Sequence, residues 1–279
     1  MDTYPFDLVF AVAEASVTIF LGFLSAKTFR SVFFAREAFK ATAAWVVIAA
    51  ISPLSVMHYP FIFAVFCFIA WWNFQQDDTF TGKIWLSLAS GLGISIGVLV
   101  ILAVTPGCLP ATSFTSFSVR DSLQAQAWDW SQIGCLVSLY LGGAIIGLAY
   151  VGYALCREAS TRSGISGFIQ NGLGLLFKLT LVRGAVVLIE CIMVPSVPLR
   201  ESPIIRELCS MLPRSIGPED VRRMDLLLVG VCVVIILPTL AYLARRAARF
   251  SSRVQPTRLL VAIMLVGFIA EILARIELL

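Results

Sequence analysis

Eight long apolar runs dominate the pattern of hydrophobic and polar positions along this chain. The apolar residues in each run are continuous rather than alternating, which favours membrane helices. A helix rises about 1.5 Å per residue, so about 20 residues cross a hydrocarbon layer about 30 Å thick. The pattern therefore predicts an all-α, polytopic membrane protein with eight transmembrane helices in a single domain, residues 1–279. The expected helices are Leu8–Ala26, Ala43–Met57, Tyr59–Phe74, Ile84–Thr105, Gln132–Cys156, Gly167–Val194, Asp225–Leu243 and Thr257–Ile276.

The second and third runs meet at His58-Tyr59-Pro60. Proline cannot donate a backbone hydrogen bond, and it biases the residue before it away from helix. We therefore expect one helix to end and the next to begin at this point, which makes the two runs a tight helical hairpin.

The composition agrees with a membrane protein. The chain is 59% hydrophobic and only 14% charged, whereas soluble globular proteins carry about a quarter charged residues. Its mean hydropathy is +0.90. About eight crossings of about 20 residues leave little chain for a water-soluble catalytic domain.

The basic residues predict the orientation in the membrane, because cytoplasmic loops carry an excess of Lys and Arg. The connections after the first, third, fifth and seventh helices contain Lys27, Arg30, Arg36, Lys40, Lys83, Arg157, Arg162, Arg245, Arg246, Arg249, Arg253 and Arg258. The opposite connections have fewer basic residues, and acidic residues balance them. Both termini are therefore expected to be extracytoplasmic. The long connections Pro106–Ser131 and Pro195–Met224 lie on the same side, and long loops are frequent sites of partner docking.

The sequence carries no motif for a tightly bound cofactor. The CxxC, HExxH, GxGxxG and phosphate-binding Gly-Lys-Ser/Thr patterns are absent. His58 is the only histidine, which excludes a haem held by two axial histidines, and the acids and cysteines have no spacing for a metal site. Cys108 and Cys209, in the two long connections, either form a bridge in an oxidising compartment or remain free thiols.

Ionisable side chains inside the apolar runs are candidates for a functional site, because each costs a few kcal/mol in the hydrocarbon layer. Arg183 and Glu190 are seven residues apart, so they share a helix face. Glu271 and Arg275 are four residues apart and adjacent on one face. We expect Glu271 and Arg275 to form an ion-pair clasp rather than a ligand site.

Glu14 and Glu190 have no opposite charge one helical turn away. Each is therefore either a packing partner for another helix or a proton-handling group. Lys178 has a long side chain and is expected to extend to the inner membrane surface.

His58 is expected at the outer membrane boundary. A neutral imidazole donates one hydrogen bond, accepts another and can carry a proton near neutral pH. Binding and deprotonation of a quinol require these properties. The alternative is a loop histidine that faces water or caps the hairpin.

Four segments together carry a resemblance to a known family. Trp45 lies thirteen residues before His58, and Trp128-Asp129-Trp130 precedes Leu141-Gly142-Gly143. A later helix opens with Arg223 and runs through Cys232 to Pro238, and the last contains Ala270-Glu271-Ile272-Leu273-Ala274-Arg275. In this combination the chain resembles the membrane anchor subunit of bacterial dimethyl sulfoxide reductases. The last segment looks like that family's closing Gly-Glu-x-x-Gly-Arg, with alanine in place of both glycines.

The resemblance implies a three-part enzyme of anaerobic respiration in the bacterial cytoplasmic (inner) membrane. This chain would anchor a molybdopterin catalytic subunit and a four-cluster iron–sulfur subunit, oxidise menaquinol and pass the electrons to the nearest cluster. It would hold no permanently bound cofactor and have no activity alone. His58 matches the family position associated with quinol binding, and Glu14 is expected to border the same pocket.

Two other classes of protein remain open. A small-solute transporter would use Glu14, Lys178, Arg183 and Glu190 as a buried path for a substrate or for protons, although two matching halves are not visible in the sequence. A membrane scaffolding protein would have no redox role.

Overall fold

The computed structural model describes residues 4–24, 29–51, 59–104, 130–159, 166–193, 228–249 and 254–276. These ranges are helical apart from short turns and helix ends, and they contain no strand. The helices are α1 (Tyr4–Phe23), α2 (Ser31–Ile51), α3 (Tyr59–Gln75), α4 (Thr79–Val104), α6 (Trp130–Ala159), α7 (Ser166–Met193), the π-helical turn η3 (Val231–Ile236), α10 (Leu237–Arg249) and α11 (Val254–Ile276).

The all-α fold predicted from the apolar runs is confirmed for the described residues. Four helices there are long and apolar enough to cross a membrane, namely Val137–Glu158, Gly167–Leu188, Leu228–Arg249 and Pro256–Leu273. Two shorter apolar stretches, Val12–Phe23 and Phe61–Gln75, lie in α1 and α3. The remaining crossings of the predicted eight stay a prediction.

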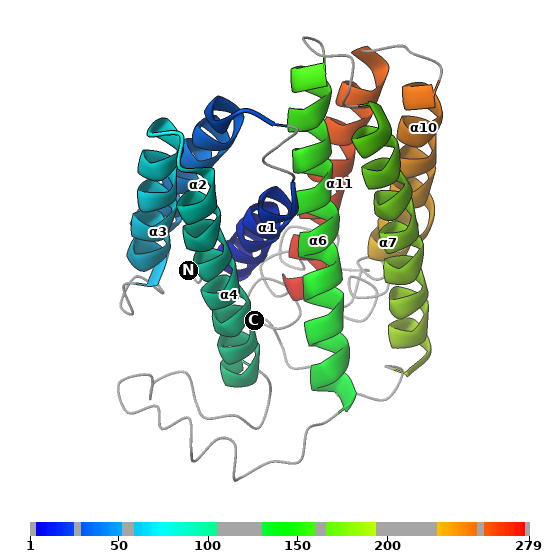
Figure 1. The fold of residues 1–279 in the computed structure, drawn as a ribbon. Coiled ribbons are helices and arrows are strands. Elements are labelled where there is room, and N and C mark those ends of the chain that lie inside the picture. Colours follow the sequence, from blue (N-terminus) through cyan, green and yellow to red (C-terminus); the bar gives the residue numbers. More distant parts are fainter. Residues whose placement is uncertain are drawn as a thin grey trace.

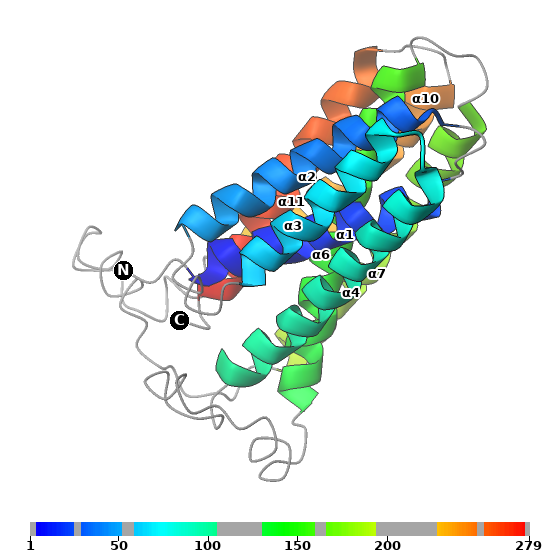
Figure 2. The same cartoon turned by 60° about the vertical axis from the view of Figure 1, so that its left-hand side comes forward.

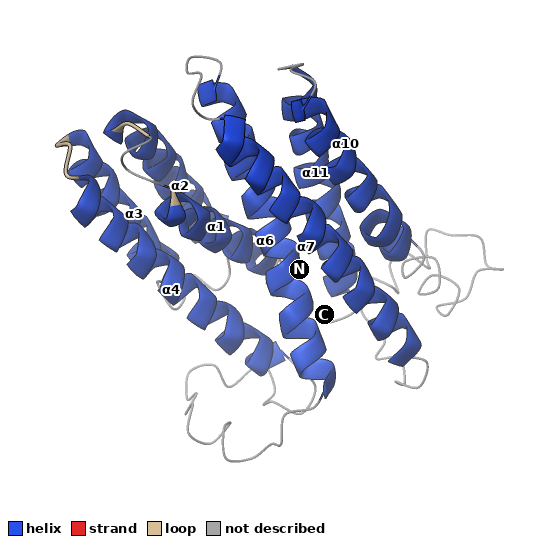
Figure 3. Cartoon of the chain, turned by 45° about the vertical axis from the view of Figure 1, so that its right-hand side comes forward, coloured by secondary structure: helices blue, strands red, loops and turns tan. Residues whose placement is uncertain are grey.

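The described helices form two rings of four, with η3 and α10 counted as one helix (Figure 1). In the first ring α1 packs on α2, α2 on α3, α3 on α4, and α4 returns to α1. In the second ring α6, α7, α10 and α11 pack in the same successive order, and α11 returns to α6. Figure 2 and Figure 3 show the two groups from other sides. Although no repeat is visible in the sequence, the two halves therefore share one order of helix packing.

The two rings meet where α1 packs along α6. The close approach depends on glycines: a Cβ on Gly143 would lie 2.5 Å from Val12 Cγ1, and one on Gly147 would lie 2.9 Å from the backbone nitrogen of Val17. Small residues four apart allow two helix backbones to approach closely in this way. Gly143 is part of the Leu-Gly-Gly segment in the resemblance, and its role here is to let α1 fit against α6.

The connections define two ends of the bundle. Helices α1, α3, α6 and α10 end, and α2, α4, α7 and α11 begin, at one end, which we call the short-loop end. Helices α2, α4 and α7 end, and α3, α6 and the turn η3 begin, at the opposite end, which we call the long-loop end after the long sequence stretches 105–129 and 194–227 that separate these helices. Because successive helices alternate in direction, α1 begins and α11 ends at the long-loop end (Figure 1).

Helix α2 corrects one predicted boundary, because it begins at Ser31 rather than at Ala43. Arg36 and Lys40, which the sequence pattern predicts in the connection after the first helix, therefore lie on a helix. The reason is a buried stripe with spacings of four and three residues that continues through the charged segment: Phe34, Ala38, Ala41, Trp45 and Ile48. The charged side chains at 36 and 40 are on the exposed face of the same helix.

The continuous helix Leu228–Arg249 contains the π-helical turn η3, which ends two residues before Pro238. The N–H of Leu237 bonds to the carbonyl of Cys232, five residues back. Proline has no N–H and its ring conflicts with the carbonyl four residues before it, so a wider turn at this point relieves the conflict.

The turn between α3 and α4 holds the short-loop end together. Asp78 caps α4 by accepting a hydrogen bond from the Thr81 N–H at 3.1 Å. A hydrogen bond with the Thr81 side chain, together with this backbone bond, keeps the pKa of Asp78 below its usual value. Ser31, at the start of α2, donates to Asp77, which has a φ of 61°. Lys83 of α4 donates to the carbonyls of Gly22 and Leu24 and so caps the end of α1.

Candidate functional site

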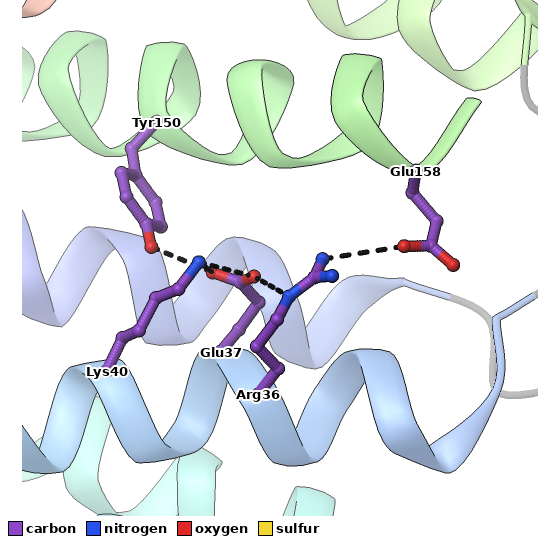
Figure 4. Close-up of polar contacts among 5 residues, drawn as sticks. All are labelled: Arg36, Glu37, Lys40, Tyr150 and Glu158. Carbon is purple, nitrogen blue, oxygen red and sulfur yellow. Dashed lines mark hydrogen bonds and ion pairs between the residues drawn. The ribbon is translucent and has the colours of Figure 1, made fainter. Parts of the chain in front are cut away.

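Glu37 is a fully buried carboxylate in α2 that accepts hydrogen bonds from three side chains (Figure 4). Arg36 Nε donates to Oε1 at 2.9 Å. Lys40 Nζ donates to Oε1 at 2.9 Å and to Oε2 at 3.1 Å. The hydroxyl of Tyr150, on α6, donates to Oε2 at 2.8 Å. Charge-assisted bonds of this kind offset the cost of removing the carboxylate from water.

The cluster around Glu37 reaches the surface through its two basic members. The side chains of Arg36 and Lys40 are 47% and 43% exposed, whereas that of Glu37 is 0% exposed. Arg36 also lies 3.4 Å from Glu158, near the end of α6. The cluster therefore links α2 to α6 and joins a buried acid to the short-loop end of the bundle.

Glu14 lies deeper in the same region of the first ring. Its Oε2 atom is buried and has no hydrogen-bond partner among the described residues. The side chain interacts electrostatically with Glu37, with Tyr150 and with the thiol of Cys67 on α3. The structure thus places the predicted site residue Glu14 beside a second acid, Glu37, that sequence reasoning did not single out.

A second polar group lies in the second ring, where Arg183 of α7 and Glu271 of α11 are both buried. Arg183 Nε donates to Glu271 Oε1 at 3.0 Å. Gly142 of α6 makes room for this acid, since a Cβ there would lie 2.1 Å from Glu271 Cδ. The predicted groups Arg183 and Glu271 therefore come together across two helices.

This pairing gives Glu271 a partner on another helix, Arg183, that the sequence did not predict. The side chains of Arg275 and Glu190 lie outside the described residues, so the clasp with Arg275 and the role of Glu190 stay predictions. Lys178 is exposed on α7, as its expected extension to the surface requires.

Trp45 is a further polar group in the first ring. Its indole is buried, and its Nε1 has no hydrogen-bond partner among the described residues. The centroid of its ring lies 4.5 Å from the ring centroid of Phe63 on α3. Phe63 is four residues after Tyr59, the first residue of α3. His58 lies outside the described residues, as do Cys108, Cys209 and the long connections that contain them.

The described residues contain no group of three or more His, Cys, Asp or Glu side chains arranged to hold a metal ion. The polar groups described above, around Glu37, Glu14, Arg183 and Trp45, are carboxylates, a phenol, an indole and basic side chains. These groups bind through hydrogen bonds and can move protons.

Comparison with known proteins adds no name to this arrangement. No protein-family model matches the chain, and no curated protein and no solved structure matches it. The functional interpretation therefore rests on the residues of this chain and on the resemblance that they carry.

Proposed function

We propose that this chain is an eight-span membrane anchor subunit that oxidises menaquinol and passes electrons to a partner four-cluster iron–sulfur subunit. The complete enzyme would include a molybdopterin catalytic subunit and would lie in a bacterial inner membrane. Both termini and the long-loop end would face outward. The chain would supply a quinol pocket and a docking face, with menaquinol as a substrate rather than a resident cofactor.

The observation that carries this proposal is the Nε1 of Trp45, which lies beside Phe63 and has no hydrogen-bond partner in the part of the chain that the structure describes. A buried N–H without a partner costs about 1–3 kcal/mol, so such a donor is often kept for a ligand. A quinol is a flat ring with oxygens that accept hydrogen bonds. A buried indole donor next to a second aromatic ring suits both of these properties.

The location of this aromatic pair also supports the proposal. Phe63 lies five residues after His58 in the sequence, which is about one and a half helical turns. His58 supplies an acceptor with an ordinary pKa near neutral pH, and quinol oxidation must release two protons with two electrons. Glu14, in the same ring, supplies a carboxyl group that can take part in that release.

The docking face would be the long-loop end. Its longest connections, Pro106–Ser131 and Pro195–Met224, combine charged residues with aromatic ones such as Trp128 and Trp130. Aromatic anchors within a polar rim are typical of protein interfaces. An iron–sulfur subunit docked there would bring its nearest cluster toward the proposed pocket.

The test is to purify the affinity-tagged chain from its native membranes in a mild detergent. We expect an iron–sulfur subunit and a molybdopterin subunit to co-purify, with iron–sulfur signals in electron paramagnetic resonance spectra that a menaquinol analogue reduces. Deleting part of Pro195–Met224 should release both subunits from membranes. A chain that purifies without redox partners, or clusters that the quinol does not reduce, would contradict the proposal.

A transporter is the second candidate, favoured by the shared packing order of the two helix rings. Internal repeats of this kind are common in secondary transporters, where buried charges mark the substrate path. The purification separates the readings, because a transporter would be active in vesicles without iron–sulfur partners. Co-purification of non-redox proteins alone would favour a scaffolding role.

A further inference from the structure

We propose that Glu14, Tyr150 and Glu37 form a proton-exchange path from the middle of the first helix ring to the short-loop end of the bundle. The path does not rest on the proposed quinol chemistry. It would equally serve a protein that moves protons for another purpose, and it ends on the side opposite to the start of α3.

The three side chains all lie between the middle of the helices and the short-loop end, and Glu37 is the nearest of them to that end. Glu14 is nine residues before the end of α1, and Tyr150 is nine residues before the end of α6. At about 1.5 Å per residue, each is about 14 Å from the short-loop end. Glu37 is six residues after the start of α2, which is about 9 Å from the same end. Arg36 and Glu158 complete the series near the surface, where they lie 3.4 Å apart.

Glu14 is the deep end of the path because its Oε2 is buried without a hydrogen-bond partner among the described residues. An ionised carboxylate in such a position is costly, whereas a carboxylic acid that carries a proton is tolerated. An ordinary packing residue in α1 would not need a carboxyl group. We therefore infer that Glu14 holds a proton and exchanges it.

Helices α2, α4, α6 and α11 pack on α1. Among the groups that interact electrostatically with Glu14, α2 supplies Glu37, α6 supplies Tyr150, and the more distant α3 supplies the thiol of Cys67. Lys83 of α4 is bound at the end of α1, and Glu271 of α11 is bound to Arg183. No described basic residue is therefore paired with Glu14, and the nearest titratable groups lead toward Glu37.

The proton steps balance without a redox partner. The Glu14 carboxyl releases its proton by way of water to the oxygen of Tyr150, because no direct hydrogen bond joins these two described side chains. Tyr150 passes its own hydroxyl proton to Glu37 along the existing bond of 2.8 Å. Glu37 then releases a proton to water beside the half-exposed Arg36 and Lys40. The reverse sequence reloads Glu14.

The experiment uses the full chain in vesicles of known orientation and an uncharged carbodiimide, a reagent that modifies protonated carboxylic acids in apolar surroundings. Mass spectrometry identifies the modified residue. We expect Glu14 to be modified in the wild-type chain. The modification should decrease when the pH is raised on the short-loop side and stay unchanged when the pH is raised on the long-loop side.

Matched tyrosine variants test the path itself. Tyr150→Phe removes the hydroxyl that bonds to Glu37, and its effect should be to slow the response of Glu14 to the short-loop pH by roughly tenfold or more. Tyr153→Phe is the control, since this residue is on the same helix and its ring packs under Arg157, with the guanidinium carbon 5.9 Å from the ring centroid. If both variants elute from a size-exclusion column at the same volume as the wild-type chain, they are folded.

Three results would overturn the inference: no modification of Glu14, a response to the long-loop pH instead, or equal rates in the two tyrosine variants. None of these measurements contains a quinol or a partner subunit. A chain that follows the expected pattern but co-purifies with no redox subunit would keep the proton path and lose the anchor function. A chain that co-purifies with redox subunits but does not follow the expected pattern of Glu14 modification would keep the anchor function and lose the proton path.

Discussion

Arg183 and Glu271 form a buried ion pair between α7 and α11, in which Nε lies 3.0 Å from Oε1 and the side chains are 1% and 3% exposed. The two residues are 88 positions apart in the sequence. Because Gly142 leaves space for the carboxylate, α6, α7 and α11 are fixed to one another at this point. The pair therefore decides how the second ring closes.

Breaking this pair on one side should destabilise the protein strongly. Glu271→Gln leaves the Arg183 charge buried without its carboxylate, which typically costs about 3–5 kcal/mol. The double variant Arg183→Met with Glu271→Leu removes both charges and should regain most of that loss. Thermal unfolding in detergent measures both effects. Equal losses in the single and double variants would show that the pair is not the source of stability.

Glycine substitutions should have opposite signs at two positions. In Gly147→Ala the new Cβ would lie 2.9 Å from the Val17 nitrogen and 3.0 Å from the Ser16 carbonyl carbon, so α1 and α6 must separate. Overpacking of this kind costs about 1–3 kcal/mol. Gly172→Ala meets nothing within 4 Å and should be neutral or stabilise α7 by up to about 1 kcal/mol. A similar change in melting temperature for both variants would contradict the role of Gly147.

The orientation of the bundle can be tested by cysteine labelling in a background without Cys108 and Cys209. Arg249→Cys, at the end of α10, should be hidden from an impermeant thiol reagent in intact cells and react only after permeabilisation. Arg206→Cys should react in intact cells, because the excess of basic residues places the short-loop end in the cytoplasm. Labelling of Arg249→Cys in intact cells would reverse the orientation.

Much of the fold could be predicted because an apolar run is a local signal. All eight expected segments overlap a helix of the structure. The start of α2 was missed because Arg36, Glu37 and Lys40 interrupt the apolar run, although the buried stripe continues through them. The helical spacing of Phe34, Ala38 and Ala41 was the signal that could have found it.

The candidate site was harder to predict because its contacts join distant parts of the chain. Glu37 depends on Tyr150, 113 residues later, and no local pattern shows that pairing. For Glu271 the sequence offered a basic residue one turn away, and it gave no sign of the ion pair with Arg183 on another helix. Burial of a charge makes a partner necessary, but only the packing of the helices decides which partner is reached.

The last prediction concerns the proposed quinol pocket and uses two variants that act on different hydrogen bonds. Trp45→Phe keeps an aromatic ring against Phe63, whose ring centroid lies 4.5 Å away, but removes the Nε1 donor, which no described residue accepts. His58→Arg keeps donors at the start of α3 but removes the acceptor that would take a quinol proton. Loss of one hydrogen bond to a substrate should lower quinol-dependent turnover by roughly tenfold or more.

Activity with an artificial soluble electron donor separates a pocket defect from an assembly defect, because that donor bypasses the membrane subunit. We expect both variants to keep this activity and to retain the partner subunits on the membrane, while quinol-dependent activity falls. The control is Phe39→Leu, which changes an exposed aromatic residue of α2 near the short-loop end, beside Trp71. Unchanged quinol-linked activity in His58→Arg would return this histidine to a role in capping the hairpin. The same result in Trp45→Phe would leave its indole a packing group, because a donor that binds the substrate cannot be removed without a change in turnover or in KM.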